Sequence, residues 1–186
     1  MLKMSRAAFL EKGLPFILSV VVVLADQLSK AYIVNNYPVP DGSIITDVFN
    51  NGILEIIHVR NNVIAFSLGT SLPAFIRPAL FIVLPLVVLV FLVIYYFISA
   101  DWTRLQRWAI AGILGGGLGN IIDRIFPPGG TSGVVDFISV KFYGIFGFDR
   151  WPTFNIADSS VVVCVILWVI TIFLMPQQTG KEKHGR

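Results

Sequence analysis

Long apolar runs dominate the chain, and shorter polar or mixed segments separate them. Four of these runs are long enough to cross a hydrocarbon core of about 30 Å, which takes roughly 20 helical residues. We therefore expect an all-α membrane protein with four transmembrane helices, at approximately residues 14–35, 76–99, 105–126 and 153–175. Pro85 lies within the second run, where a proline leaves a backbone carbonyl without its helical partner and can kink the helix.

The start of the first run is similar to a signal peptide, because basic residues precede the apolar stretch 14–25. A small-residue cleavage site would be expected next, but Asp26, Gln27 and Lys30 follow instead. We expect an uncleaved first helix, and a single integral membrane domain over residues 1–186.

The composition agrees with a membrane protein, with 55% hydrophobic residues, 13% charged residues and a mean hydropathy of +0.78. Cys164 is the only cysteine, so these residues hold no internal disulfide and no cysteine metal cluster. A net charge of +3 can indicate nucleic-acid binding in a soluble protein, but the basic residues here follow membrane topology. We expect no nucleic-acid partner.

The basic residues predict the orientation of the helices. Eight of the 14 lie before the first helix, between the second and third, or after the fourth, and a four-helix chain places these segments on one side. Lysine and arginine favour the cytoplasmic side, so we expect both termini there. The two other connections, approximately 37–75 and 127–152, then face outward.

The two outward segments differ in character. In the first, the β-branched runs 44–49 and 53–59 flank Asn50-Asn51-Gly52, which predicts a hairpin and a small periplasmic β-sheet. The second begins with the turn-rich stretch 127–130 and continues with aromatic residues around Lys141. Because aromatic side chains favour the headgroup level, we expect this second segment to be an interfacial periplasmic loop.

Polar residues gather at one depth of the predicted bundle, near the outer ends of three helices. They are Asp26, Lys30, Asn120, Asp123, Arg124, Asn155 and Asp158. Ionisable residues at membrane depth are costly and generally functional. A site near the outer surface explains their common depth, whereas a continuous ion path would need polar residues at other depths too.

Together with Asp136, the carboxylates of this group fall into two classes. Asp26 has Lys30 four residues away and Asp123 directly precedes Arg124, so both are interpreted as charge-paired. Asp136 and Asp158 have no neighbouring base in the sequence. Brought together at low dielectric, two carboxylates cannot both ionise, which is the basis of aspartic protease chemistry. The alternative is two unrelated interfacial carboxylates.

Three further features point to packing. Small residues spaced by four, Gly112 with Gly116 and Gly115 with Gly119, predict a face for close helix contact. Cys164 has no histidine placed to activate it, and His58 has no second histidine or cysteine outside to share a metal.

Five ordered motifs make the chain resemble bacterial lipoprotein signal peptidase, also called signal peptidase II. They are Asp26-Gln27-Leu28-Ser29-Lys30, Arg60-Asn61 with Ala65-Phe66, Gly119-Asn120-Ile121-Ile122-Asp123-Arg124, Val134-Val135-Asp136-Phe137 and Phe154-Asn155-Ile156-Ala157-Asp158. The resemblance implies an aspartic endopeptidase of the bacterial inner membrane, sensitive to the peptide globomycin. It also implies diacylglyceryl-modified prolipoproteins as substrates, cleaved on the N-terminal side of the lipid-modified cysteine.

The resemblance also implies roles for single residues. Asp136 and Asp158 match the catalytic pair of the family. Other matching positions hold the substrate backbone and the catalytic pair, namely Asn61, Asn120, Arg124 and Asn155. Asp26, Lys30 and Asp123 match structural positions, with Asp123 supporting Arg124. The outer sheet matches the family's periplasmic cradle, and the aromatic loop matches its lid over the site.

The chain departs from the family pattern in two places. Val63 and Ile64 stand where the family has glycine and alanine, which changes a turn expected to touch the substrate. The linker before Asp136 is longer and carries the Pro127–Gly130 insert, written Pro127-Pro128-Gly129-Gly130. Both differences bear on substrate or inhibitor binding.

Other functions predict different sequence features. A proton- or cation-coupled small transporter needs polar residues along its full depth, and a presenilin-like protease needs a different glycine-aspartate motif and more helices. A non-enzymatic assembly factor would use the polar cluster for packing alone. The resemblance implies no cofactor and no metal, with membrane lipids and prolipoproteins as partners of a monomer.

Overall fold

The computed structural model describes residues 6–62, 73, 75–99 and 102–174. Several positions used above lie outside these ranges, among them Val63, Ile64, the motif residues Ala65 and Phe66, and four of the eight basic residues that predict the orientation. The expectations that rest on these residues stay predictions.

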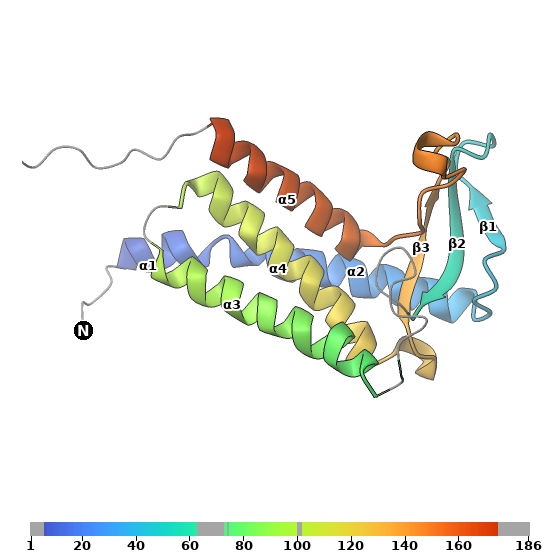
Figure 1. Ribbon diagram of the computed structural model, residues 1–186, viewed down its shortest axis with the longest axis horizontal. Helices are drawn as coiled ribbons and strands as arrows, with labels where there is room; N and C mark the ends of the chain where they lie inside the picture. Colours follow the sequence, from blue (N-terminus) through green and yellow to red (C-terminus); the bar gives the residue numbers. More distant parts are fainter. Residues whose placement is uncertain (1–5, 63–72, 74, 100–101, 175–186) are drawn as a thin grey trace, which may run out of the picture.

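The helices form a bundle with a small sheet at one end (Figure 1). A short helix, α1 (Arg6–Gly13), precedes α2 (Phe16–Asn36), and a π-helical turn, η1 (Ala79–Val83), leads into α3 (Leu84–Ile98). The chain continues through α4 (Arg104–Ile125) and ends its described part in α5 (Ile156–Leu174). α1 begins and α5 ends at the end of the bundle opposite the sheet.

The predicted helices agree with these four long helices to within a few residues. Three segments are long and apolar enough to span a membrane, Leu10–Asn36, Ala79–Ile98 and Ile156–Leu174. Their outward faces carry many exposed apolar side chains, for example Val20, Val87 and Val163, as expected where lipid is the solvent. The chain is a membrane protein.

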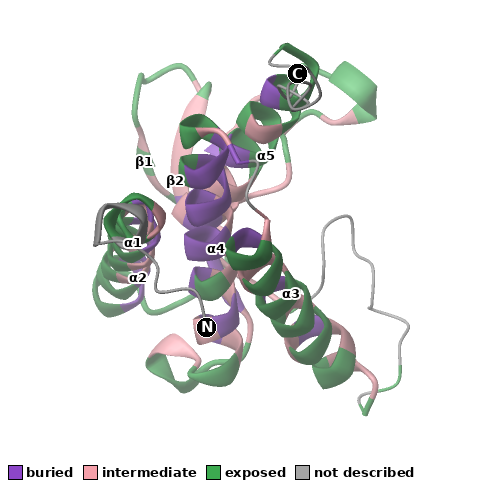
Figure 2. Cartoon of the chain, turned by 90° about the vertical axis from the view of Figure 1, so that its left-hand side faces the viewer, coloured by how far each residue is buried: buried purple, intermediate pink, exposed green. Residues whose placement is uncertain are grey.

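The fourth long helix, α4, lies at the centre of the bundle. It packs against α2, α3 and α5, and Figure 2 shows it as the most continuously buried helix. Because most of its 22 residues face other helices rather than lipid, α4 tolerates a lower hydropathy than its neighbours.

Glycines in α4 make this central position possible. A Cβ at Gly115 would lie 2.8 Å from the backbone of Ser19 in α2, and one at Gly116 would collide with the Ala157 carbonyl oxygen in α5. A Cβ at Gly117 would lie 2.7 Å from the side chain of Leu89 in α3. Consecutive glycines thus face three different helices, which confirms the predicted close packing.

The sheet has three antiparallel strands in the order β1-β2-β3, namely β1 (Ile44–Asp47), β2 (Leu54–Asn61) and β3 (Val134–Val140). The predicted hairpin is confirmed as β1 and β2. β3 was not predicted, because its first four residues are all buried and it lacks the alternation of a half-exposed strand. The segment expected as a loop at 127–152 therefore supplies a third strand, and Asp136 lies in it, opposite Val59.

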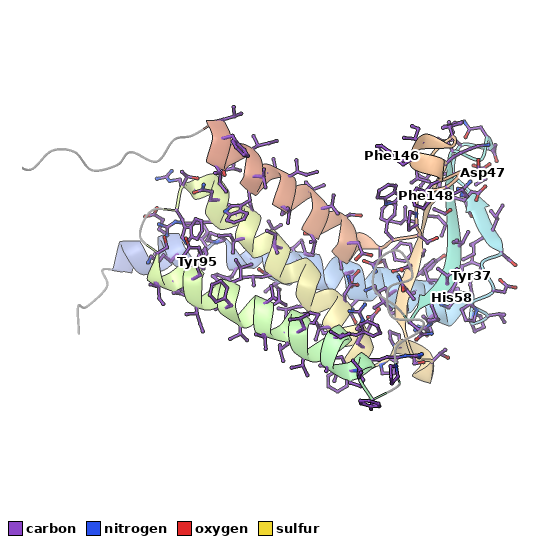
Figure 3. The ribbon with its side chains drawn as sticks, viewed as in Figure 1. Tyr37, Asp47, His58, Tyr95, Phe146 and Phe148 are labelled. Atoms are coloured by element: carbon purple, nitrogen blue, oxygen red, sulfur yellow. The ribbon has the colours of Figure 1, made fainter. Side chains whose placement is uncertain are left out.

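Two contacts of β2 fix the sheet to the rest of the protein. His58 Nδ1 donates to the carbonyl oxygen of Tyr37 at 2.6 Å, which ties the sheet to the end of α2 (Figure 3). Arg60 donates to the carbonyl oxygens of Pro128, Thr131 and Gly133, at 2.7, 3.2 and 3.5 Å. The insert before β3 is thus bound by the strand that pairs with β3.

The close approach of α4 and α5 predicts the effect of a single methyl group. Gly116→Ala would place a Cβ against the Ala157 carbonyl, and overpacking of this kind costs about 1–3 kcal/mol. We expect a lower melting temperature in detergent. Gly13→Ala is the control, because no heavy atom lies within 4 Å of its added Cβ. Equal melting temperatures for both variants would contradict the packing argument.

Candidate active site

Four elements bring polar side chains together at the sheet end of the bundle. α2 supplies Asp26 and Lys30, α4 supplies Asn120 and Asp123, α5 supplies Asp158, β3 supplies Asp136, and Asn155 directly precedes α5. Hydrogen bonds and ion pairs connect all seven residues.

The ammonium group of Lys30 is the centre of this network. Its Nζ lies 2.7 Å from Asp26 Oδ2 and 3.1 Å from Asp123 Oδ2, and the side chains of all three residues are fully buried. Nζ also donates to Asn120 Oδ1 at 3.1 Å. The amide of Gln27 adds a hydrogen bond to Asp123 at 2.9 Å. One buried cation therefore compensates two buried carboxylates from different helices.

Asp123 forms its ion pair with a residue other than its sequence neighbour, although the charges of Asp123 and Arg124 still interact at longer range. The sequence suggested Arg124, whereas the structure pairs Asp123 with Lys30. Adjacent residues of a helix point in different directions, so sequence neighbours rarely face each other. Asp123 also accepts a hydrogen bond from the backbone N–H of Val135 at 3.0 Å, which attaches α4 to β3.

Arg124 points instead to the start of α3. Its Nη1 donates to the carbonyl oxygen of Phe81 at 3.0 Å, and its guanidinium lies 5.7 Å from the centre of the Phe81 ring. Pro85 has no N–H to offer this carbonyl four residues earlier, as the sequence predicted, so the carbonyl is available to Arg124.

Asp158 is held at the beginning of α5 by a reciprocal pair of hydrogen bonds. The Asp158 N–H donates to Asn155 Oδ1 at 2.9 Å, and the Asn155 N–H donates to Asp158 Oδ2 at 3.2 Å. This is the capping-box arrangement of a helix N-terminus. The neighbouring Ala157 N–H donates to Asp26 Oδ1 at 3.0 Å, so α2 also helps to cap α5.

Asp136 is almost fully buried, with 2% of its surface exposed. Its two carboxylate oxygens accept from Asn61 Nδ2 at 2.9 Å and from Asn155 Nδ2 at 2.7 Å. Burial, followed by the nearby charge of Asp158, raises the pKa of Asp136 to about 7. The two hydrogen bonds favour the ionised form but do not cancel the cost of burial.

Lys30 also determines which way the amide of Asn120 points. Asn120 Oδ1 accepts from Lys30 and from Asn155 Nδ2, so its amide N–H groups are directed away from both. Asn120 Nδ2 donates to Asp158 Oδ1 at 2.7 Å. The orientation of the Asn120 amide thus depends on the buried charge of Lys30.

The arrangement has a buried side and an accessible side. Asp26, Lys30, Asp123, Asp136 and Asn155 are buried, whereas Asn61, Asn120, Arg124 and Asp158 are partly exposed. Solvent can therefore reach the second group directly. Within the described ranges, no group of three or more histidine, cysteine, aspartate or glutamate side chains could hold a metal ion.

The structure brings together nearly all the residues that the sequence singled out. Arg124 is the exception, because it bonds to Phe81 rather than to a residue of the network. Sequence reasoning missed the structural roles of Gln27 and Arg60, although both lie inside the quoted motifs. It also missed the backbone N–H groups of Val135 and Ala157, which no side-chain pattern could reveal.

Comparison with known proteins identifies the family. The family model for signal peptidase (SPase) II matches residues 18–174, which is most of the chain. The chain belongs to the signal peptidase II family. It is 46% identical over 173 residues to the lipoprotein signal peptidase of Treponema denticola, covering 92% of this chain and 95% of that one. For the lipoprotein signal peptidase of Borreliella afzelii the identity is 43% over 163 residues, with 88% and 91% covered.

Solved structures agree with this membership of the signal peptidase II family. Two bacterial membrane enzymes match with TM-scores of 0.69 and 0.68, at 30% and 32% sequence identity. The first match covers 94% of both chains, and the second covers 89% of this chain and 95% of the other. The chain is thus a membrane peptidase, and neither the relatives nor the structures support the transporter considered above.

The buried ion network predicts a large effect of removing its cation. Lys30→Met leaves Asp26 and Asp123 buried without a counter-charge, and breaking a buried pair in this way costs about 3–5 kcal/mol. We expect a much lower unfolding temperature in detergent. Lys12→Met is the control, because Lys12 makes an exposed hydrogen bond to the Phe97 carbonyl. If both variants unfold alike, Lys30 does not have the proposed structural role.

Proposed function

We propose that this chain is an aspartic endopeptidase that removes signal peptides from diacylglyceryl-modified prolipoproteins, with Asp136 and Asp158 as its catalytic pair. Cleavage would occur on the N-terminal side of the lipid-modified cysteine. Membership of the signal peptidase II family and the lipoprotein signal peptidases among its relatives support the substrate class.

The hydrogen bonding of Asn155 is the observation that carries the catalytic proposal. This single residue bonds to both Asp136 and Asp158, so the two carboxylates belong to one small site. Lys30 is already paired with Asp26 and Asp123. Among the described residues, no lysine or arginine forms an ion pair with Asp136 or Asp158. The charges of Lys30 and Arg124 act on the two carboxylates from farther away, and we infer that a shared proton relieves the repulsion that remains.

Such a pair can hydrolyse a peptide bond in the usual acid-base manner. The ionised carboxylate takes a proton from water, and the water oxygen attacks the scissile carbonyl carbon. The protonated carboxyl donates its proton to the carbonyl oxygen, giving a tetrahedral diol. The carboxyl that took the proton from water then donates it to the amide nitrogen, while the other carboxylate takes a proton from the diol. The C–N bond breaks to give a carboxylic acid and an amine, and the pair returns to its starting protonation state. We infer that Asp136 holds the shared proton, because it is the more deeply buried of the two.

The partly exposed residues suit a role in substrate binding. Asn61, Asn120 and Arg124 lie on the accessible side and offer N–H donors that a peptide carbonyl could accept from. Asn155 is buried behind them and orients both carboxylates. Acyl chains of the substrate could remain in lipid between the helices while the peptide bond reaches the site.

We place the protein in the bacterial inner membrane with both ends in the cytoplasm and the site near the periplasmic face. The basic residues of the cytoplasmic connections support this orientation, and α1 begins and α5 ends at the same end of the bundle (Figure 1). The three-stranded sheet would then lie outside, beside the lipid surface. We expect a monomer that is inhibited by globomycin.

The catalytic pair predicts complete loss of activity in two single variants. Asp136→Asn and Asp158→Asn each remove a carboxylate that can exchange a proton with water or substrate. We expect neither to cleave a diacylglyceryl-modified prolipoprotein in detergent, while melting temperatures show that both remain folded. Asp41→Asn is the control, because this carboxylate is exposed and bonds to the Ser43 N–H. Cleavage by either test variant would refute the assignment.

The pKa of Asp136 predicts the alkaline limb of the pH profile. Activity should fall as pH rises through about 7, when the pair loses its shared proton. Asn61 donates to the Asp136 carboxylate and so lowers its pKa. In Asn61→Ala that pKa rises, and the alkaline limb of kcat/KM against pH should move up by about one pH unit.

Asn36→Ala serves as the control for this profile, because Asn36 lies at the exposed end of α2 and bonds to the Tyr32 carbonyl. Its alkaline limb should coincide with that of the parent protein. A downward or absent shift in Asn61→Ala would show that Asn61 does not act on the charge of Asp136.

A further inference from the structure

A compact aromatic turn follows β3 and occupies residues 142–148. The Phe142 N–H donates to the Asp149 carbonyl at 2.7 Å, and the Gly144 N–H donates to the Phe148 carbonyl at 2.9 Å. The Gly147 N–H closes the tip on the Gly144 carbonyl at 3.0 Å. The aromatic turn is thus a built element with its own backbone hydrogen bonds.

Two residues of the aromatic turn adopt an unfavourable backbone conformation. Tyr143 and Phe146 both have φ of 54°, in the left-handed region that residues other than glycine rarely occupy. Gly144 and Gly147 also have positive φ, at no such cost. Strain at a non-glycine position points to a use for the side chain that occupies it.

The side chains at the tip of the aromatic turn are exposed rather than packed into the core. Phe146 is 85% exposed, Tyr143 is 64% exposed and Ile145 is 50% exposed. Beneath them, the Phe142 and Trp151 rings pack with centroids 4.9 Å apart. The inner rings support a tip of three apolar side chains that contribute little to the core.

The tip points toward the side on which lipid must lie. In Figure 3, Phe146 and Phe148 lie on the helix side of the sheet, whereas Asp47 lies on its far side. The chain then leads into α5, whose exposed face carries apolar residues such as Val162 and Ile166. The exposed tip thus continues, at the sheet end, the surface that the helices present to lipid.

A lysine near the tip suits the headgroup layer. Lys141 Nζ lies 5.5 Å from the centre of the Tyr143 ring, at the start of the aromatic turn. A cation at the base of an exposed aromatic tip matches an interface with phosphates above the acyl chains.

We propose that the tip of the aromatic turn, Tyr143, Ile145 and Phe146, inserts into the outer leaflet of a phospholipid bilayer and so sets the height of the sheet above the membrane. The partner is the bilayer itself. This proposal rests on the geometry of residues 141–151 and does not depend on the proposed catalytic activity.

The aromatic turn is firmly connected to the strand that carries Asp136. Arg150 Nη2 donates to the Ser139 carbonyl and Nε to the Ser139 hydroxyl, at 2.9 and 2.7 Å. The same guanidinium donates to the Gly52 carbonyl at 2.9 Å and pairs with Glu55 at 3.0 Å. Ser139 lies about 10 Å along β3 from Asp136, at roughly 3.3 Å per residue. The depth of the tip therefore constrains the position of Asp136 relative to lipid.

A lid over the site is the competing use of the aromatic turn. β3 runs from Val134 to Val140, so Asp136 is near its beginning and the aromatic turn is attached to its other end. The contacts of Arg150 hold that end on the β1–β2 hairpin rather than over Asp136.

Spin labelling in a lipid nanodisc tests the insertion. In a Cys164→Ala background, a nitroxide is attached at Phe146→Cys, in phosphatidylethanolamine and phosphatidylglycerol. We expect its relaxation to respond strongly to oxygen, which concentrates in lipid, and weakly to a water-soluble nickel complex. Ile44→Cys is the control, because Ile44 is 60% exposed on the outermost strand β1 and should respond mainly to nickel.

A label at 146 that is as accessible to nickel as the label at 44 would overturn the proposal.

A second measurement tests the connection to Asp136, and it rests on the proposed function. Phe146→Ser should lower prolipoprotein cleavage several-fold in nanodiscs and leave cleavage in detergent unchanged. An equal loss of cleavage in nanodiscs and in detergent would indicate a lid and would overturn the anchoring role. The spin label reports insertion independently of cleavage activity.

Discussion

The rest of the structure depends on the burial of one positive charge. Lys30 is fully buried, and it is stable there because two carboxylates and an amide oxygen surround its ammonium group. These partners come from α2 and α4, and Asp26 also caps α5. The same contacts therefore hold three helices together. One set of contacts thus both stabilises the helix bundle and orients the groups beside the proposed catalytic pair.

The sequence predicted those parts of the fold that depend on residues close together in the chain. The four helices follow from apolar length, and the β1–β2 hairpin follows from Asn50-Asn51-Gly52. β3 escaped prediction because a strand buried on both faces has no period of two. The partner of Asp123 was misassigned because helix geometry separates sequence neighbours, whereas Lys30 reaches it from another helix.

The site residues also divide into those that the sequence predicted and those whose contacts depend on the fold. The cost of a carboxylate at membrane depth singled out Asp136 and Asp158, and the family motifs supplied their neighbours. The family motifs implied that Asn155 helps to hold the pair, but its bonds to both carboxylates could not be derived from local sequence, because they require the relative placement of α5 and β3. Burial and the nearby charge of Asp158 then give Asp136 a pKa near neutrality.

The distribution of charges in this network has a consequence for the cost of placing each helix in a membrane. α2 carries Asp26 and Lys30, and α4 carries Asp123 and Arg124. At the depth of the site, each helix thus has one acidic and one basic residue and no net charge, and a net charge at membrane depth is costly. In the folded protein, Lys30 pairs with both acids and Arg124 holds the Phe81 carbonyl. The ion network therefore joins two helices that are each neutral at this depth.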